Sequence, residues 1–436
     1  MKKVSLIVTL FFVINSAFSQ SLLSYINQSN EFLETLDKGK YDDAQNFFAD
    51  SLKDQITSLM LKNFWLNTKS QLGDFKTVDG AQNNAMGNYQ AVILNCAFTN
   101  GLQSFRFVFN KSVKLIGLNV MPTKTELSYQ EPKYADTTLY IEKFIELKSG
   151  SHSLAGMLTI PKKVKNFPIV VLIHGSGPND MDETLGPNKP FKDIALGLAA
   201  KGIATLRYVK RTLVYGNEFK KAYTTKEEVI DDALAAIIYA QNTPNVNLQQ
   251  VYVLGHSLGG MLSPKLATLN KGINGIILAA APARSFTDLM VEQNDYLFTT
   301  LKDTSLIGKN NLKANLLALQ KTRIKSLGNL KPDSLILGIP ASYWVDLNNY
   351  DPVTTAKKLK NRMFIFQGET DFQVSVTDFN LWKKALGNNK NVSFKLYPEL
   401  NHLLTPQSEK GTMQQYLRPG SVANYLIDDI AAWIKK

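Results

Sequence analysis

Hydrophobic and polar residues follow two different periods in the first part of this chain. Up to residue 72, apolar residues recur at helical spacing in three segments, Asn30 to Leu36, Ala44 to Leu52 and Lys53 to Leu72. After Gly73 the period changes to two, which predicts strands at Tyr89 to Phe98, Gln103 to Phe109 and Val113 to Val120. Helices followed by antiparallel strands predict a small α+β domain over residues 20–121.

From residue 138 to the end, short apolar runs alternate with amphipathic segments. The runs predict strands at Leu139 to Leu147, Leu154 to Ile160, Ile169 to Ile173, Ala204 to Tyr208, Val251 to Leu254, Ile273 to Ala280, Arg362 to Phe366 and Val392 to Leu396. Helices are predicted at Phe191 to Ala200 and at Ser421 to Lys435. A third helix should begin at a capping box formed by Thr225 and Glu228 and run through Ala240. This alternation predicts an α/β domain over residues 138–436, with a doubly wound, mostly parallel sheet and right-handed crossovers.

Two segments interrupt this organisation. Residues 122–137 hold Pro122, Pro132 and several threonines, which predicts a linker between the domains. Residues from about 284 to 350 are helical in pattern and mix polar with apolar positions. An insert at this point lies over the carboxyl ends of the strands, where such sheets bind ligands, so we predict a helical lid. The alternative is a helical layer that only adds core.

The segment Val251 to Gly260 carries the most specific chemistry. Its apolar residues run directly into Gly-His-Ser-Leu-Gly-Gly, a G-x-S-x-G pattern that holds Ser257 on a tight bend between a strand and a helix. Gly255 and Gly259 are expected to be required, because a Cβ there would collide with a neighbouring strand or helix. A serine hydroxyl becomes a good nucleophile when a base removes its proton, so the chain should supply a histidine and an acid elsewhere.

Four histidines compete for the role of base. The context of three of them disfavours this role. His256 is beside the serine and should face away from it, His174 belongs to another motif, and His152 lies in a turn before the sheet core. His402 follows the last predicted strand and is the predicted general base.

The predicted acid is Asp371, on the loop after the strand that ends at Phe366, with Glu369 as the alternative. The chain order Ser257, Asp371, His402 is that of α/β-hydrolases and differs from the other serine-hydrolase folds.

A tetrahedral intermediate also needs two backbone N–H groups aimed at its oxygen. One is predicted at Leu258, which opens the helix after the serine. The other should come from the His-Gly-Ser-Gly-Pro segment after the strand Ile169 to Ile173, where Ser176 is the first choice and Gly175 the alternative.

From about residue 138, the chain resembles the α/β-hydrolase superfamily, most of all bacterial esterases. The resemblance rests on His-Gly-Ser-Gly-Pro-Asn-Asp, Arg-Tyr-x-Lys-Arg, Gly-His-Ser-Leu-Gly-Gly and Gly-Glu-x-Asp-x-Gln-Val. It implies hydrolysis of small or medium carboxylic esters through an acyl-enzyme, with Ser257, Asp371 and His402 as a catalytic triad. The first domain resembles the cystatin-like or nuclear-transport-factor-like modules that precede some exported hydrolases.

The chain departs from these relatives at one place. They usually carry Asp and Gly where this sequence has Val209 and Thr212, which leaves the local loop structure open. The acidic residues after Pro178 are expected to be solvated loop charges, with a role in shaping the mouth of the site as the alternative (Asp180, Asp182 and Glu183).

Two other functions share parts of this pattern. A serine peptidase or amidase of the prolyl-oligopeptidase type has the same fold and order, but the segment before residue 138 is too short for a β-propeller. A non-catalytic binding protein on a hydrolase scaffold is disfavoured by the complete set of motifs. No metal or cofactor is predicted, because four scattered histidines and one cysteine offer no ligand spacing. The net charge of +12 is dispersed, which argues against nucleic acid.

The first residues have the pattern of a secretory signal peptide over residues 1–19. Lys2 and Lys3 precede the apolar run Leu6 to Ile14, and Ala17-Phe18-Ser19 supplies small residues before a cut at Gln20. We therefore expect an exported protein, periplasmic or secreted, with an uncleaved anchor as the alternative. No later stretch is apolar for about 18 residues, so no stable membrane insertion is expected. The single Cys96 excludes an internal disulfide, and the sequence predicts no particular oligomeric state.

Overall fold

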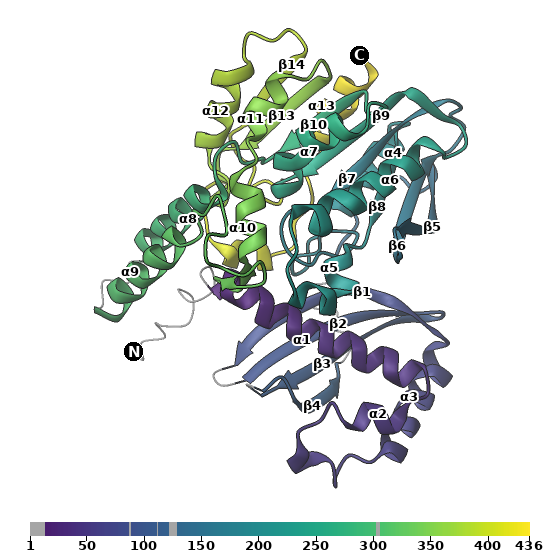
Figure 1. Cartoon of the computed structure of the whole chain (residues 1–436). Helices are drawn as coiled ribbons and strands as arrows, with labels where there is room; N and C mark the ends of the chain where they lie inside the picture. Colours follow the sequence, from purple (N-terminus) through teal and green to yellow (C-terminus); the bar gives the residue numbers. More distant parts are fainter. Residues whose placement is uncertain (1–13, 87–88, 111, 122–128, 302–305) are drawn as a thin grey trace.

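The computed structural model describes residues 14–86, 89–110, 112–121, 129–301 and 306–436. Within these residues, a four-stranded sheet forms the core of a small N-terminal domain and an eight-stranded mixed sheet that of a larger one. The long helix α1 (Ile14–Asp37) lies on the smaller sheet and also contacts the larger domain (Figure 1). The predicted fold class is confirmed. Most of the predicted signal peptide lies outside the described residues.

The N-terminal sheet is an antiparallel meander of β1 (Phe75–Met86), β2 (Tyr89–Phe98), β3 (Gly101–Phe109) and β4 (Leu115–Val120). Alternate residues of β2 and β3 are buried and pack with Phe32 of α1 and Trp65 of α3 (Ser58–Leu72). The expected helix at Ala44 to Leu52 is instead a short α2 (Tyr41–Gln45) and a 3-10 turn. The strand β1 was not predicted, because two register shifts near its start break the alternation that marks a strand.

The larger sheet has the order β14-β13-β10-β9-β7-β8-β6-β5. The pairs β5–β6 and β6–β8 are antiparallel and the remaining pairs are parallel. The strands are β5 (Tyr140–Ser149), β6 (His152–Pro161), β7 (Phe167–Ile173), β8 (Ala204–Tyr208), β9 (Val246–His256), β10 (Gly275–Ala279), β13 (Arg362–Gly368) and β14 (Val392–Tyr397). Each agrees with a predicted strand to within a few residues.

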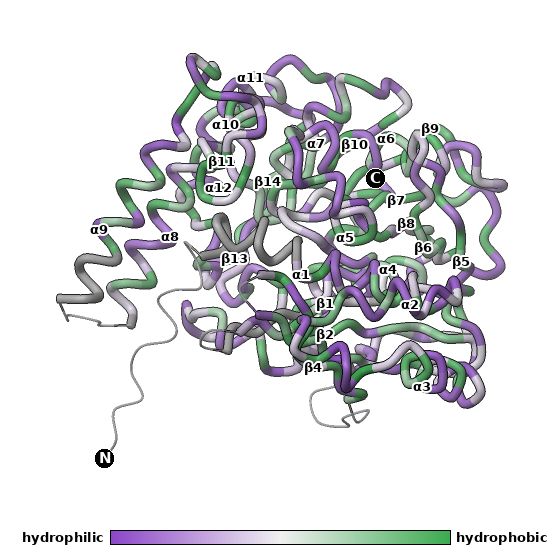
Figure 2. The backbone as a smooth tube through the Cα atoms, turned by 60° about the horizontal axis from the view of Figure 1, so that its bottom comes forward, coloured by the Kyte–Doolittle hydropathy of each residue, from purple (hydrophilic) through white to green (hydrophobic). Residues whose placement is uncertain are grey.

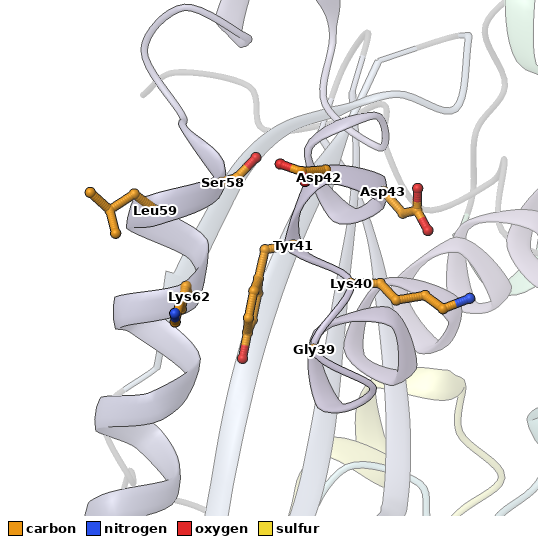
Figure 3. Close-up of a pocket in the computed structure, with 8 residues that line it drawn as sticks. All are labelled: Gly39, Lys40, Tyr41, Asp42, Asp43, Ser58, Leu59 and Lys62. Carbon is orange, nitrogen blue, oxygen red and sulfur yellow. The ribbon is translucent and has the colours of Figure 1, made fainter.

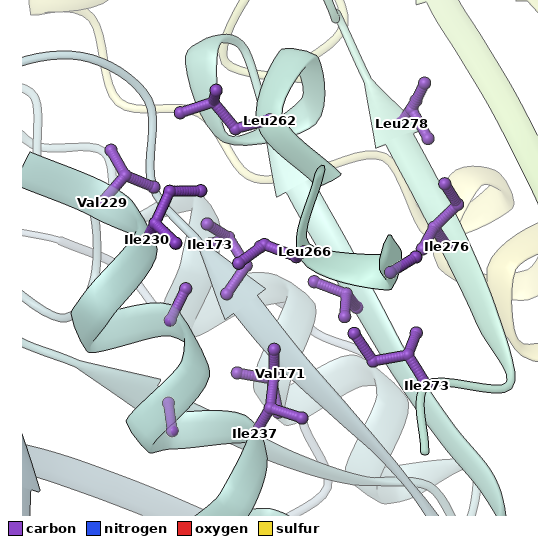
Figure 4. Packing of buried hydrophobic residues seen from close by; sticks show 14 of the residues in the cluster. Val171, Ile173, Val229, Ile230, Ile237, Leu262, Leu266, Ile273, Ile276 and Leu278 are labelled. Atoms are coloured by element: carbon purple, nitrogen blue, oxygen red, sulfur yellow. The ribbon is translucent and has the colours of Figure 1, made fainter. Parts of the chain in front are cut away.

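Helices cover both faces of this sheet. One face packs on α6 (Asp231–Gln241), α7 (Leu258–Leu269) and α12 (Val376–Leu386), and the other on α4 (Pro190–Ala200) and α13 (Asn424–Lys435). Figure 4 shows the first layer, where Val171 and Ile173 of β7 meet side chains of α6 and α7. Val170 and Leu172 point to the other face, so the continuous apolar run of β7 fills both layers.

The start of α6 differs from the prediction. Residues Lys226–Ile230 form a π-helical turn, and Thr225 caps nothing with its side chain. Thr225 N–H instead donates to Asp346 at 3.0 Å. Glu228 is buried and accepts from Lys210 at 3.0 Å, so the expected capping box does not form.

The insert between β10 and β13 is mainly helical, with α8 (Phe286–Leu301), α9 (Leu306–Gln320) and α10 (Ala341–Asn348) and the short β11 (Leu335–Ile336) and β12 (Ile339–Pro340). The antiparallel pair α8 and α9 extends away from the body of the molecule (Figure 1). Where Figure 2 colours them, both helices carry hydrophobic and hydrophilic residues in alternation. The remaining short elements are α5 (Arg211–Val214), η2 (Gly216–Lys220), α11 (Pro352–Lys357) and η4 (Met413–Leu417). Among the described residues, every helix is too short or too polar to span a bilayer.

Candidate active site

The bend between β9 and α7 holds Ser257 in an unusual backbone conformation. Its φ is 52° and its ψ is −119°, a region that non-glycine residues rarely adopt and that marks strain at functional sites. A Cβ on Gly255 would lie 2.3 Å from Gly259 O, and one on Gly259 would lie 2.3 Å from Ile173 O. The predicted need for glycine at both positions is thus confirmed. Ser257 N–H donates to Ala279 O at 2.9 Å, which ties the bend to the end of β10.

Asp371 and His402 lie side by side, although 31 positions separate them in the sequence. Their Oδ2 and Nδ1 atoms are 2.7 Å apart. The second oxygen, Oδ1, accepts from the backbone N–H groups of Gln373 at 2.7 Å and Val374 at 2.9 Å, and Gln367 Nε2 donates to Oδ2 at 3.0 Å. Every lone pair direction of this fully buried carboxylate is therefore used, and its orientation is fixed.

The two loops that carry this pair can meet because of a glycine and an asparagine. A Cβ on Gly368, at the end of β13, would lie 1.9 Å from Leu400 O. In the histidine loop, Asn401 Oδ1 accepts from the N–H groups of Leu403 at 2.9 Å and Thr405 at 3.2 Å. Glu369, the alternative acid, is exposed and is not joined to His402.

Ser257 and His402 line one pocket of about 400 Å³. Its walls come from the segment after β7, from α8 and β12 of the insert, and from the N-terminal domain, including Gly175, Ser176, Leu289, Ile339, Ile26 and Ala81. The structure thus places the predicted serine and histidine at one cavity, with the predicted acid behind the histidine. A separate hollow of about 510 Å³ lies between α2 and α3 (Figure 3). Lys40 and Leu59 point in opposite directions there, so its side chains do not converge on a ligand.

The segment after β7 is the expected source of an oxyanion donor. Gly175 N–H donates to Glu183 Oε1 at 2.6 Å, so the alternative that assigned it to the oxyanion is contradicted. Gly177 N–H is likewise taken, by Glu228 Oε1 at 3.0 Å. Within the described residues, the N–H groups of Ser176 and Leu258 donate to no protein acceptor, which leaves them for a ligand.

Glu183 and His256 form a second buried pair that the sequence analysis missed. Glu183 Oε2 lies 2.8 Å from His256 Nδ1, and His256 Nε2 lies 2.8 Å from the carbonyl oxygen of His402. Burial alone would lower the pKa of His256, but the Glu183 carboxylate holds it above its usual value. The pair therefore connects the backbone at Gly175 to the backbone at His402, and both residues line the pocket with Ser257.

The other two histidines lie apart from the serine. His174 is fully buried between the rings of Phe191 and Tyr208, with centroid distances of 5.0 and 5.1 Å. Burial lowers its pKa to about 4, so it stays neutral at pH 7. His152 is the first residue of β6, and its Nε2 lies 2.8 Å from Glu218 Oε2.

The expectation of solvated acidic residues after Pro178 was wrong. Asp180, Asp182 and Glu183 are all buried, and Asp182 pairs with Arg207 and, at 3.0 Å, with Lys189. The sequence carried no local signal for this, because the pairing cations come from other elements. The segment that departs from the relatives is ordered as well: Lys210 Nζ donates to Gly175 O at 2.9 Å, and Val209 and Thr212 are buried around the start of α5.

Asp180 is a buried carboxyl whose two oxygens differ. Oδ1 accepts from the N–H groups of Asp182 at 3.1 Å and Thr184 at 2.9 Å, while Oδ2 has no hydrogen-bond partner. Burial, followed by the nearby Asp182 charge, raises the pKa of Asp180 to about 7. The native state therefore favours the protonated form, whose stabilising contribution is full below the usual Asp pKa and is lost as the pH rises through about 7.

We expect Asp180→Asn to be more stable than wild type at pH 8, and this gain to be larger at pH 8 than at pH 5. The amide keeps the Oδ1 bonds and removes the cost of a buried charge, by about 1 kcal/mol or more at pH 8. Thermal unfolding at both pH values measures the change in Tm. As a control, Asp182→Asn should destabilise at pH 8, because it breaks the pair with Arg207. A Tm difference between Asp180→Asn and wild type that is the same at both pH values would contradict the buried neutral carboxyl.

Among the described residues, no group of three or more His, Cys, Asp or Glu side chains is arranged to hold a metal ion. The pocket and the residues behind it bring together a serine, an imidazole, a buried carboxylate and backbone N–H groups.

Comparison with known proteins places this site in context. Residues 190–409 match the family model described as serine aminopeptidase, S33, and residues 29–118 match a protein family of unknown function, DUF3887. The chain is 38% identical to Esterase EstD of Thermotoga maritima over 406 residues, which is 93% of this chain and 94% of the relative. It is 26% identical over 187 residues to a putative carboxymethylenebutenolidase of Synechocystis, covering 37% of this chain and 72% of that protein.

Among solved structures, Est1E from Butyrivibrio proteoclasticus aligns with a TM-score of 0.43 and 16% identity, covering 67% of this chain and 99% of its own. A likeness at this level has no bearing on the reaction. The near full-length match to EstD and the match to the S33 model agree with the strand order and with the motifs around Ser257. The chain therefore belongs to the α/β-hydrolase family that includes Esterase EstD.

Proposed function

We propose that this chain is a serine esterase that hydrolyses carboxylic esters of small or medium acyl groups. The observation that carries the proposal is the 2.7 Å contact between His402 Nδ1 and the buried Asp371, next to a pocket that His402 shares with Ser257. The 38% identity to Esterase EstD over nearly the whole of both chains supports the ester substrate.

In this mechanism Ser257 Oγ attacks the ester carbonyl carbon while His402 Nε2 takes its proton. Asp371 accepts the Nδ1–H bond and stabilises the imidazolium. The N–H groups of Leu258 and Ser176 donate to the oxygen of the tetrahedral intermediate. The C–O bond to the alcohol then breaks, and His402 returns the proton to the leaving alkoxide. Water attacks the acyl-enzyme by the same steps and releases the acid, with Ser257 restored.

A serine peptidase or amidase is the second candidate, because the matching family model is described as a serine aminopeptidase. An aminopeptidase needs an unpaired carboxylate to bind the ammonium group of its substrate. The two glutamates that line the pocket are both paired, Glu183 with His256 and Glu228 with Lys210. This pairing favours an uncharged ester over a peptide amino terminus.

The deciding experiment compares nitrophenyl esters of graded chain length with aminoacyl anilides. We expect the esters to be hydrolysed with much higher kcat/KM, and a fluorophosphonate probe to modify Ser257, as located by peptide mass spectrometry. We propose further that residues 1–19 are removed on export, so protein prepared from a periplasmic extract should begin at Gln20 by intact mass. Faster anilide cleavage would favour the peptidase, and a probe adduct on a different residue would refute the mechanism.

A further inference from the structure

The N-terminal domain reaches the pocket that holds Ser257. Ile26 of α1 and Ala81 of β1 line this pocket, and Ile26 is only 3% exposed. The same helix contacts β12 of the insert, whose Ile339 also lines the pocket. One cavity is thus bounded by the α/β-hydrolase domain, its insert and the N-terminal domain.

Apolar packing fixes the N-terminal domain against the hydrolase domain. The core of the N-terminal domain continues without a break into side chains of the larger domain (Met157, Met181, Val209 and Leu213). Two of these residues, Val209 and Leu213, come from the segment after β8 and are almost fully buried. Such continuous burial differs from the smaller and more polar contacts between domains that move freely.

Close and polar contacts between the two domains accompany this apolar packing. Asn30 Nδ2 of α1 donates to Leu213 O at 2.8 Å, and a Cβ on Gly216 would lie 2.0 Å from Asn27 Oδ1. On β1, a Cβ on Gly80 would lie 3.1 Å from Asp180 Oδ2. Gly80, the neighbour of Ala81, therefore lies close to the buried acidic segment that follows Pro178, and Ala81 and Ser257 line the same pocket.

The lining of the pocket divides by polarity. Polar groups gather near the serine, from the segment after β7 and from Glu183 and Glu228. The part contributed by the N-terminal domain and the insert is mainly apolar, with Ile26, Ala81, Phe286, Leu289, Met290 and Ile339. Apolar walls of this kind bind hydrocarbon and discriminate by size.

We propose that the N-terminal domain forms one wall of the acyl-binding part of the pocket, and that Ile26 and Ala81 set the length of the acyl chain that fits. The proposal rests on the esterase function proposed above. It gives a role in substrate selection to the domain that matches a family of unknown function. A larger side chain at position 81 shortens the space for hydrocarbon, and a smaller one at position 26 lengthens it.

Two variants and a control test this wall in the full chain. Ala81→Phe should lower kcat/KM for nitrophenyl octanoate by about 10-fold while changing the acetate value little. Ile26→Ala should shift the ratio of octanoate to acetate in the opposite direction. Leu102→Phe, on β3 of the same domain at a side chain that is 58% exposed, is the matched control and should leave the ratio unchanged. Titration with a fluorophosphonate counts the intact sites in each preparation.

A second readout separates this wall from the esterase proposal. Labelling of Ser257 by phosphonates with short and long alkyl chains needs a reactive serine but no turnover of an ester. If Ala81→Phe slows the long-chain probe in a protein that hydrolyses no ester, the wall stands and the esterase function fails. If the wild type hydrolyses esters but neither Ala81→Phe nor Ile26→Ala changes the chain-length ratio or the labelling rates at a full site titre, the wall is overturned.

Discussion

We expect Ser257→Ala to lower kcat for ester hydrolysis by at least about 10⁴-fold, because the substitution removes the hydroxyl that forms the acyl-enzyme in the proposed mechanism. The loss should be confined to chemistry. The Ser257 side chain makes no capping hydrogen bond to α7, so its hydroxyl contributes little to the fold. Alanine also keeps the positive φ at this position and neither adds nor relieves strain of the kind that glycine would remove.

The measurement is kcat for nitrophenyl butyrate together with the Tm of each variant. Ser263→Ala is the matched control, because Ser263 is a buried serine of the same helix whose Oγ donates to Gly259 O at 2.8 Å. We expect Ser263→Ala to lose some stability and keep most of its activity. Ser257→Ala should keep its stability and lose its activity. Substantial hydrolysis by purified Ser257→Ala would refute Ser257 as the nucleophile.

Most strands of both sheets could be predicted, because the pattern of apolar and polar residues in a strand indicates which of its faces are buried. The β7 run is apolar throughout and is buried on both faces, whereas β2 and β3 alternate and are buried on one. The strand β1 was missed because bulges and polar residues interrupt its period. A strand of this kind is specified by its pairing partner rather than by its own pattern.

The serine bend, the histidine and the acid could be proposed from local motifs, because each follows a recognisable strand. The buried residues that support these groups could not be proposed in this way. Glu183 is buried against His256, and Glu228 is drawn into a pair with Lys210, which removes it from the capping box that its position suggested. These pairings depend on which elements the topology brings together, and spacing along the chain contains no information on them.

Val209 shows how the two domains constrain each other. The sequence alone suggested only an altered loop at this place. In the structure Val209 is fully buried in the core shared with the N-terminal domain. An apolar side chain is therefore what the domain contact requires here, because an unpaired carboxylate in that core would be costly.

Asp371→Asn should lower kcat by about 10³- to 10⁴-fold, an effect that follows from the hydrogen bonds around the carboxylate. Oδ1 accepts from the N–H groups of Gln373 and Val374, so an asparagine must keep its carbonyl oxygen there. Its NH₂ group then replaces Oδ2 and faces His402 Nδ1. To accept this donor, His402 must carry its proton on Nε2, which leaves no lone pair to receive the Ser257 proton.

Glu369→Gln is the control for this substitution. Glu369 sits on the same loop two residues earlier, is exposed, and should change kcat by less than about twofold. Both variants are compared with wild type by kcat for nitrophenyl butyrate and by Tm. Asn keeps the two bonds that Oδ1 accepts, which Ala would delete, and loses the bond that Gln367 Nε2 donates to Oδ2. A large loss in Glu369→Gln beside full activity in Asp371→Asn would transfer the acid role to Glu369. A large loss in Asp371→Asn beside nearly full activity in Glu369→Gln would support the buried Asp371 carboxylate as the group that sets the tautomer of His402.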